Sequence, residues 1–137
     1  MILSVDIGTT AMKMGVYRTA GEALELVDSF SCEYRINTYN DGLFGDIEPD
    51  KWQQAFINGC GRLAEHMAAI EVISLSGTTP GLTAIGHNGE ALYPAILMLD
   101  QRSRDQAKRI IDDIGLAYLL DHTANVPVAG GCSLAPR

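Results

Sequence analysis

Short apolar stretches separated by turn residues make up the N-terminal part of the chain. Residues 2–5 are mostly apolar and run into the turn-like segment 6–10, which predicts a buried strand followed by a tight loop. Apolar positions alternate with others in residues 12–17, and a third strand pattern covers residues 24–34. Because short turns join these stretches, we predict an antiparallel meander.

Glycine, asparagine and aspartate gather in residues 37–45, which we predict to be a loop. Apolar residues at helical spacing then predict a helix over residues 49–69: Trp52, Phe56, Cys60, Leu63 and Met67. Gly59 and Gly61 weaken this helix, since each costs about 1 kcal/mol relative to alanine unless close packing needs it. We interpret the acids at positions 46, 48 and 50 as solvated, and His66 as a surface or packing residue.

The second half of the chain continues the alternation of strands and helices. Strands are predicted over residues 72–76, 82–85 and 93–99, with a turn at residues 86–89. The segment that begins at Ser103 resembles a capping box, with Asp100 as an equal candidate for the cap. Gly115 closes the apolar stripe of a second helix. The predicted order is therefore β-β-β-α-β-β-β-α, which places the chain in the α/β class with a mixed sheet.

Composition and charge narrow the class of protein. The chain has 137 residues, of which 47% are hydrophobic, and a formal net charge of −7. This length suits one small domain or part of a larger one, and an acidic chain lacks the basic face that nucleic-acid binding needs. No apolar stretch of about 18 residues predicts a membrane span. The three cysteines lie far apart without a Cys-x-x-Cys pair, so we expect reduced thiols in a cytoplasmic protein.

The turn after the first strand has the residue types of a phosphate-binding loop. Gly8 allows close approach of the backbone to a ligand, and the N–H groups and hydroxyls of Thr9 and Thr10 can surround a phosphate oxygen. The carboxylate of Asp6 repels phosphate, so it fits such a site only with a divalent cation between them, and Lys13 adds positive charge. The same pattern also fits an ordinary hairpin turn, which the local sequence alone favours. No Walker-type loop and no dinucleotide fingerprint is present.

Segments in order along nearly the whole chain resemble the motifs of the FGGY carbohydrate kinases. They are VDIGTT at residues 5–10, DIEPDKW at 46–52, ISLSG at 73–77, LYPAILMLDQR at 92–102, TAN at 123–125 and APR at 135–137. The FGGY kinases belong to the actin/hexokinase/Hsp70 superfamily. The resemblance therefore implies a ribonuclease-H-like (actin-like ATPase) fold, which this chain would contain incompletely.

The resemblance implies that the whole protein is an ATP-dependent kinase of a sugar or polyol, with ATP and Mg²⁺ as cofactors and a small molecule as its partner. By position in the family motif, Asp6 would hold Mg²⁺, mainly through water. The residues expected along the nucleotide phosphates are Gly8, Thr9, Thr10 and Lys13.

The same resemblance places the substrate near four residues further along the chain, which are Thr78, Thr79, Asp100 and Arg102. One departure from the family motifs concerns substrate specificity. Xylulokinase-like members carry a histidine where this chain has Pro80, and proline offers no side-chain hydrogen bond. Glycerol kinases carry Arg-Glu at this place. Since both signatures are missing, the sequence does not identify the sugar.

The family is also several times longer than this chain, and its general base is an aspartate that would lie beyond Arg137. We therefore expect residues 1–137 to be the first part of the N-terminal kinase domain, inactive alone and without a catalytic residue. A non-catalytic nucleotide-binding or interaction module of the same fold is the alternative. A binding domain of another class with a fortuitous Asp6–Thr10 turn is a third hypothesis. Uncovered apolar surface also predicts self-association of the chain.

Overall fold

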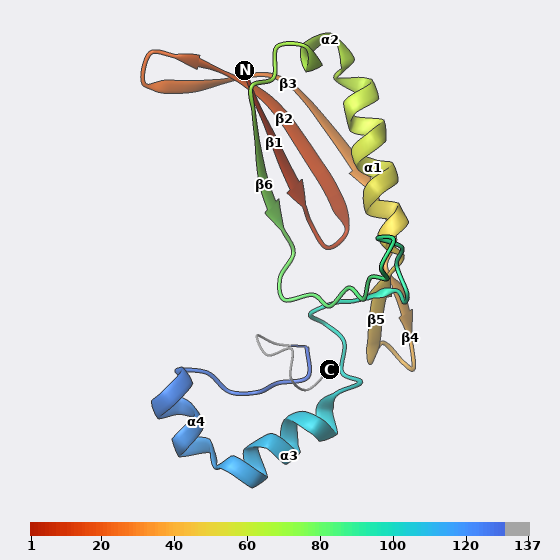
Figure 1. Cartoon of the computed structure of the whole chain (residues 1–137), viewed down its shortest axis with the longest axis vertical. Coiled ribbons are helices and arrows are strands. Elements are labelled where there is room, and N and C mark those ends of the chain that lie inside the picture. The colour runs from red at the N-terminus through yellow and green to blue at the C-terminus, as the bar shows by residue number, and fades with distance from the viewer. Residues whose placement is uncertain (131–137) are drawn as a thin grey trace. The chain divides into compact units, whose positions relative to one another are not determined.

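A computed structural model describes residues 1–130 of the chain (Figure 1). It divides into two compact units. The first unit consists of Met1–Arg35 and Asp50–Thr78, and the second of Ile36–Pro49 and the chain from Thr79 onward. Each unit has its own sheet, and the two are described separately below. None of the helices in the described part of the chain is long and apolar enough to span a membrane.

The sheet of the first unit confirms the predicted meander. Its strands are β1 (Ile2–Ile7), β2 (Ala11–Ala20), β3 (Ala23–Glu33) and β6 (Val72–Gly77), in the spatial order β3-β2-β1-β6. Strands β1 and β3 are antiparallel to β2, whereas β6 is parallel to β1. The sheet is therefore mixed, as the alternation of strands and helices predicted.

Helices α1 (Pro49–Arg62) and α2 (Ala64–Met67) cover one face of this sheet (Figure 1). Alternate strand residues meet the apolar stripe of the helices and form the core: Leu3, Val5, Met12, Met14, Val16, Ala55 and Leu63. The single helix predicted over residues 49–69 is wrong at Leu63, which is fully buried and leaves helical geometry at φ −97° and ψ 18°. The N–H of His66 then donates to the carbonyl of Leu63, which starts the short α2.

The opposite face of the sheet carries polar side chains. Successive strand residues point to opposite faces, so the residues between the buried ones face away from α1. On β1 and β2 these include Ser4, Asp6 and Lys13, which are half-buried or exposed while their neighbours Val5, Met12 and Met14 are buried. The two-residue period of the strands thus puts the predicted phosphate-site residues Asp6 and Lys13 on the same polar face.

Strand β6 is the exposed edge of the sheet. All six of its residues are exposed, including the large apolar residues Val72, Ile73 and Leu75 at 53%, 54% and 70%. Within the described residues β6 pairs only with β1, so its other edge presents free backbone groups. Such an edge is a template for pairing with another chain. The exposed β6 edge is a surface through which the chain could self-associate, and self-association stays a prediction.

The second unit contains β4 (Asn37–Tyr39), β5 (Phe44–Ile47) and β7 (Ala95–Ile96), arranged in the order β4-β5-β7. The loop predicted over residues 37–45 is wrong, because β4 and β5 pair antiparallel as a hairpin. The asparagine, aspartate and glycine that indicated a loop form its turn. Asn40, Asp41 and Gly42 all have positive φ, which these residue types adopt most readily.

Two predicted strands of the second unit are much shorter in the structure. Residues 82–85 take part only in isolated bridges, Leu82 with Ile96 and Ile85 with Ala91, and the strand predicted over residues 93–99 is limited to β7. Pro94 directly precedes β7 and has no N–H to donate to a ladder, which is a physical reason for the late start. The α/β class is confirmed, while the predicted element order is wrong in these details.

The helices of the second unit in the described part of the chain are α3 (Arg104–Ile114) and α4 (Leu116–Thr123). Gly115 closes α3 as predicted, with φ +93°. The predicted capping box is wrong, since the Ser103 side chain makes no cap hydrogen bond and instead donates to the carbonyl of Ala129 at 3.1 Å. The family mark at residues 135–137 lies outside the described residues.

Candidate functional site

The Asp6–Thr10 turn closes the β1–β2 hairpin. The segment therefore has the backbone geometry of a hairpin turn. The N–H of Gly8 donates to the carbonyl of Ala11 at 2.9 Å, and the Tyr34 hydroxyl donates to the carbonyl of Gly8. A Cβ on Gly8 would lie 2.8 Å from the Ala11 carbonyl oxygen, closer than real contacts allow. The glycine is therefore required by the turn itself, and its own N–H is not available to a ligand.

The turn nevertheless offers donors to an anion. Among the described residues, the backbone N–H groups of Thr9 and Thr10 have no hydrogen-bond partner. Thr10 is exposed and Thr9 half-buried. Two successive free N–H groups beside two hydroxyls match the anion-binding arrangement expected of a phosphate loop. A hairpin turn and a phosphate-binding loop are thus compatible in this structure.

Asp6 and Lys13 lie directly opposite each other in the β1–β2 register, just before and after the turn. On the other side of β1, Asp6 neighbours Ser76 of β6. Within the described residues, no hydrogen bond or ion pair engages the Asp6 carboxylate or the Lys13 amine. A carboxylate without a protein partner fits a hydrated Mg²⁺, which takes one or two carboxylates and keeps several waters. The residues present therefore fit the metal and phosphate roles predicted for them.

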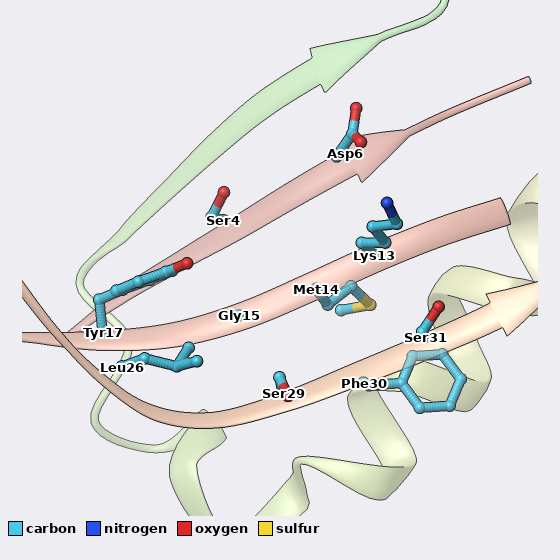
Figure 2. Close-up of a pocket in the computed structure, with 10 residues that line it drawn as sticks. All are labelled: Ser4, Asp6, Lys13, Met14, Gly15, Tyr17, Leu26, Ser29, Phe30 and Ser31. Atoms are coloured by element: carbon cyan, nitrogen blue, oxygen red, sulfur yellow. The ribbon is translucent and has the colours of Figure 1, made fainter.

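A depression of about 370 Å³ lies on the polar face beside these residues (Figure 2). Its lining comes from three neighbouring strands: Ser4, Asp6, Lys13, Met14, Gly15, Tyr17, Leu26, Ser29, Phe30 and Ser31. Gly15 is one of the lining residues, and a Cβ there would lie 2.7 Å from the Tyr17 ring, so a larger residue would displace that ring. Lys13 also lines a second depression of about 640 Å³ together with Thr10 and Tyr34. Lys13 thus lines two depressions next to the turn.

The structure brings together two residues that the sequence assigned to different ligands. The hydroxyl oxygens of Thr9 and Thr78 are 3.0 Å apart, and the N–H of Thr78 donates to the carbonyl of Ile7 at 2.8 Å. Strands β1 and β6 are parallel, so their carboxyl ends meet at the same edge of the sheet, where open α/β sheets bind ligands. The phosphate turn and the start of the predicted substrate segment therefore adjoin each other. Thr79 is exposed and belongs to the second unit.

Tyr34 is a site residue that the sequence did not indicate. Its hydroxyl holds the carbonyl of Gly8, and its N–H donates to the carbonyl of Thr10 at 2.9 Å, so it fixes the turn from both ends. Burial raises the pKa of the Tyr34 phenol, which keeps it a donor. The hairpin β2–β3 separates Tyr34 from the turn in sequence, and no local pattern relates them.

Asp100 and Arg102 form a buried ion-pair cluster with Asp46 in the second unit. Arg102 binds Asp100 through Nε at 2.9 Å and Nη2 at 2.8 Å, and binds Asp46 through Nη2 at 2.9 Å. Both carboxylates are 1% exposed. The interpretation of Asp46 as a solvated acid is therefore wrong, because the β4–β5 hairpin turns its side chain toward Arg102.

The Asp100 carboxylate is fully used within this cluster. Besides Arg102 Nε and Nη2 it accepts the backbone N–H of Arg102 and that of Gly45, each at 2.8 Å. Burial would raise the pKa of Asp100, but these hydrogen bonds outweigh it and hold the pKa below the ordinary value. The hydrogen bonds with Asp100 in turn raise the pKa of Arg102. The substrate-binding role expected of Asp100 and Arg102 stays a prediction.

Three aromatic rings surround the Arg102 guanidinium. Its central carbon lies 5.1 Å from the ring centre of Phe44, 5.8 Å from that of Tyr93 and 5.9 Å from that of Tyr39. Arg102 also donates to the Tyr93 hydroxyl at 3.1 Å, and the Tyr39 hydroxyl donates to Asp46. These contacts connect the β4–β5 hairpin with the segment before α3. The cluster positions that segment of the second unit.

The depressed pKa of Asp100 predicts that acid destabilises the chain. Because its folded pKa lies below the ordinary value of 3.8, the contribution of Asp100 to stability is present above about pH 4 and is lost as the pH falls through the folded pKa. Urea unfolding followed by circular dichroism between about pH 2 and pH 7 should show a flatter pH dependence for Asp100→Asn than for the wild type. Asp113→Asn, at an exposed position of α3, is the control and should keep the wild-type slope. Equal slopes for wild type and Asp100→Asn would contradict the prediction.

Comparison with solved structures identifies the fold. Over 96% of this chain, the fold matches a glycerol kinase from Plasmodium falciparum with a TM-score of 0.81 at 18% identity, covering 26% of that chain. A xylulose kinase from Rhodospirillum rubrum matches over 92% of this chain and 26% of its own, with a TM-score of 0.80 at 19% identity. The described fold is thus that of the actin-like ATPase kinases, present in part.

The sequence comparison then gives the family. Residues 1–132 match the model of the FGGY family of carbohydrate kinases, N-terminal domain, and the chain belongs to this family. A xylulose kinase from Staphylococcus xylosus is 30% identical over 131 residues, which is 94% of this chain and 26% of the relative. A xylulose kinase from Lactococcus lactis is 29% identical over 133 residues, again 94% of this chain and 26% of the relative. The chain therefore spans about a quarter of the length of these relatives.

Proposed function

We propose that the protein to which this chain belongs transfers the terminal phosphoryl group of ATP to a hydroxyl of a sugar or polyol. Residues 1–137 would be the first part of its N-terminal domain and supply the phosphate-binding hairpin. The observation that carries the proposal is the pair Asp6 and Lys13, in register across a turn whose Thr9 and Thr10 N–H groups lack partners among the described residues. Family membership supports it independently.

Each residue of the hairpin has a distinct task in this proposal. Asp6 would hold Mg²⁺ through water, and the metal, when bound, neutralises charge on the phosphate oxygens. The Thr9 and Thr10 N–H groups would donate to phosphate oxygens, and Lys13 would add a cation. Tyr34 and Gly8 keep the turn in place through their hydrogen bond. No described residue is proposed as general base, and we assign that task to a carboxylate outside this chain.

The substrate would lie next to the carboxyl ends of β1 and β6. The contact of Thr78 with Thr9 supports a role for Thr78 there, and Thr79 follows it in the chain. Two relatives are named xylulose kinase, so we propose a ketose as the first substrate to test. Pro80 limits the side-chain hydrogen bonds that this segment can offer. The free thiols Cys32 and Cys60 support a cytoplasmic location, where ATP-dependent sugar phosphorylation takes place.

Nucleotide binding by the 137-residue chain is the direct test of the hairpin. We expect Mg²⁺-dependent binding of ATP by calorimetry, and a loss of about tenfold or more in affinity for Lys13→Met, since a hydrogen bond to a charged group contributes about 1.5–3 kcal/mol. Asp6→Asn should remove the dependence on Mg²⁺. Lys108→Met is the matched control, because Lys108 pairs with Asp112 on the exposed side of α3. Unchanged ATP binding by Lys13→Met and Asp6→Asn would contradict the proposal.

The choice of substrate has to be measured on the full-length protein that contains these residues. ATP consumption should be measured over ketoses, pentitols, glycerol and aldonates. We expect turnover with one of these classes and its loss in Asp6→Asn. ATP binding without turnover of any acceptor would instead favour a non-catalytic nucleotide-binding module.

A further inference from the structure

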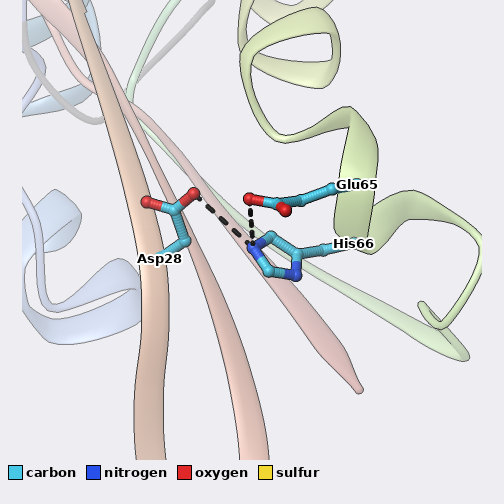
Figure 3. Close-up of side chains that lie close together, drawn as sticks. All are labelled: Asp28, Glu65 and His66. Atoms are coloured by element: carbon cyan, nitrogen blue, oxygen red, sulfur yellow. Dashed lines mark ion pairs between the residues drawn. The ribbon is translucent and has the colours of Figure 1, made fainter.

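A second group of metal-ligating side chains lies on the first unit, away from the Asp6–Thr10 turn. Asp28 from β3 meets Glu65 and His66 from α2 (Figure 3). One ligand atom from each residue lies within 4.8 Å of the other two. The local pattern predicted a surface or packing role for His66. Glu65 precedes it in α2, but Asp28 becomes its neighbour only when β3 and α2 pack together.

The distances within this group are those of a metal coordination sphere. His66 Nε2 lies 3.5 Å from Asp28 Oδ2 and 3.6 Å from Glu65 Oε1. These contacts are longer than ordinary hydrogen bonds, which are near 2.9 Å. Around a tetrahedral Zn²⁺ with bonds of about 2.1 Å, neighbouring ligand atoms are about 3.4 Å apart. The two distances from His66 Nε2 therefore match edges of such a tetrahedron, and the two carboxylate oxygens lie within 4.8 Å of each other.

The site is partly preorganised. Oδ1 of Asp28 accepts the N–H of Ser29 at 2.7 Å, which fixes the carboxylate and leaves Oδ2 directed at His66. The side chains of His66 and Asp28 are 17% and 23% exposed, so packing limits their rotamers. Glu65, at 76%, is free to adjust. Two held ligands and one mobile ligand leave a fourth position open to water.

The ligand types favour a transition metal over Mg²⁺. An imidazole and carboxylates are all ligands that Zn²⁺ accepts, whereas Mg²⁺ takes oxygen ligands alone. The cation Arg62 lies 3.4 Å from the same Asp28 oxygen and opposes a metal there. We propose that Asp28, Glu65 and His66 form a Zn²⁺ site on the surface of the first unit, separate from the proposed Mg²⁺ site at Asp6, and that Arg62 weakens its affinity.

Zinc titration of the chelator-treated 137-residue chain tests this proposal. A competing chromophoric zinc indicator should report one saturable site in the wild type, and His66→Gln should lose it, with a loss of about tenfold or more in affinity. Arg62→Gln should bind zinc more tightly than the wild type, because it removes the competing cation from Asp28. That gain of affinity cannot result from misfolding. Circular dichroism confirms that the variants are folded.

The control is His122→Gln. His122 also has a nearby carboxylate, Asp121 at 3.6 Å, but the described residues give it no third ligand atom, so zinc binding should be unchanged. Cobalt(II) then identifies the ligand atoms, since a thiolate-to-cobalt absorption band would assign binding to the cysteines. That band, or equal zinc affinity of wild type and His66→Gln, overturns the proposal. Weaker binding by Arg62→Gln would also overturn it.

Discussion

Replacing Arg102 by methionine is expected to lower the free energy of unfolding by about 3–5 kcal/mol, the usual cost of removing one partner of a buried ion pair. Methionine keeps much of the side-chain volume among the aromatic rings, so the loss reports mainly on charge. Without the guanidinium, the carboxylates of Asp46 and Asp100 stay buried at 1% exposure with no cation between them. Urea unfolding followed by circular dichroism measures the effect.

Hydrogen exchange shows which part of the chain Arg102→Met destabilises. The N–H of Gly45 donates to Asp100, so its protection should fall in the variant. Arg104→Met is the matched control, since Arg104 is exposed and its side chain has no partner among the described residues. It should change the free energy of unfolding by less than about 0.5 kcal/mol. Adding Asp46→Asn to Arg102→Met should recover part of the loss by removing one unpaired charge. Arg102→Met as stable as the wild type would show that this cluster does not hold the second unit.

Gly59 and Gly61 lie two residues apart in α1, and alanine at each is expected to change stability in opposite directions. A Cβ on Gly59 would lie 2.1 Å from Met14 Sδ and 2.9 Å from Phe30 Cδ1. Both neighbours belong to the packed core or its border, so they must move, at a cost of about 1–3 kcal/mol. The better helix propensity of alanine returns about 1 kcal/mol. We expect Gly59→Ala to lower the free energy of unfolding by up to about 2 kcal/mol.

Gly61→Ala is the matched control for this prediction. A Cβ on Gly61 meets nothing within 4 Å and the residue is exposed, so the propensity term acts alone. We expect a gain of up to about 1 kcal/mol. Trp52 is the only tryptophan of the chain and lies in α1, so its fluorescence follows urea unfolding of the first unit. A stabilising Gly59→Ala would mean that the helix does not approach the sheet this closely.

The hydrophobic pattern predicted the elements that can be recognised from the spacing of apolar residues alone. The meander β1–β2–β3 and the strand β6 follow from short apolar stretches bounded by turns, and α1 follows from apolar residues every three or four positions. The β4–β5 hairpin was not predicted because its turn, and the strand residues Asn37 and Gly45, are of types that favour loops. The strand expected over residues 82–85 does not form, and Leu82 and Ile85 make isolated bridges instead.

By itself, the sequence determined the family, the α/β class and the position of the Asp6–Thr10 turn, since these depend on residue types close together in the chain. Tertiary structure alone decided which distant side chains meet. Tyr34 fixes the turn, Thr78 contacts Thr9, and Asp46 pairs with Arg102 because strand pairing and hairpin geometry bring them together. The physical reason is that burial and partnership depend on packing between elements, which no local pattern records.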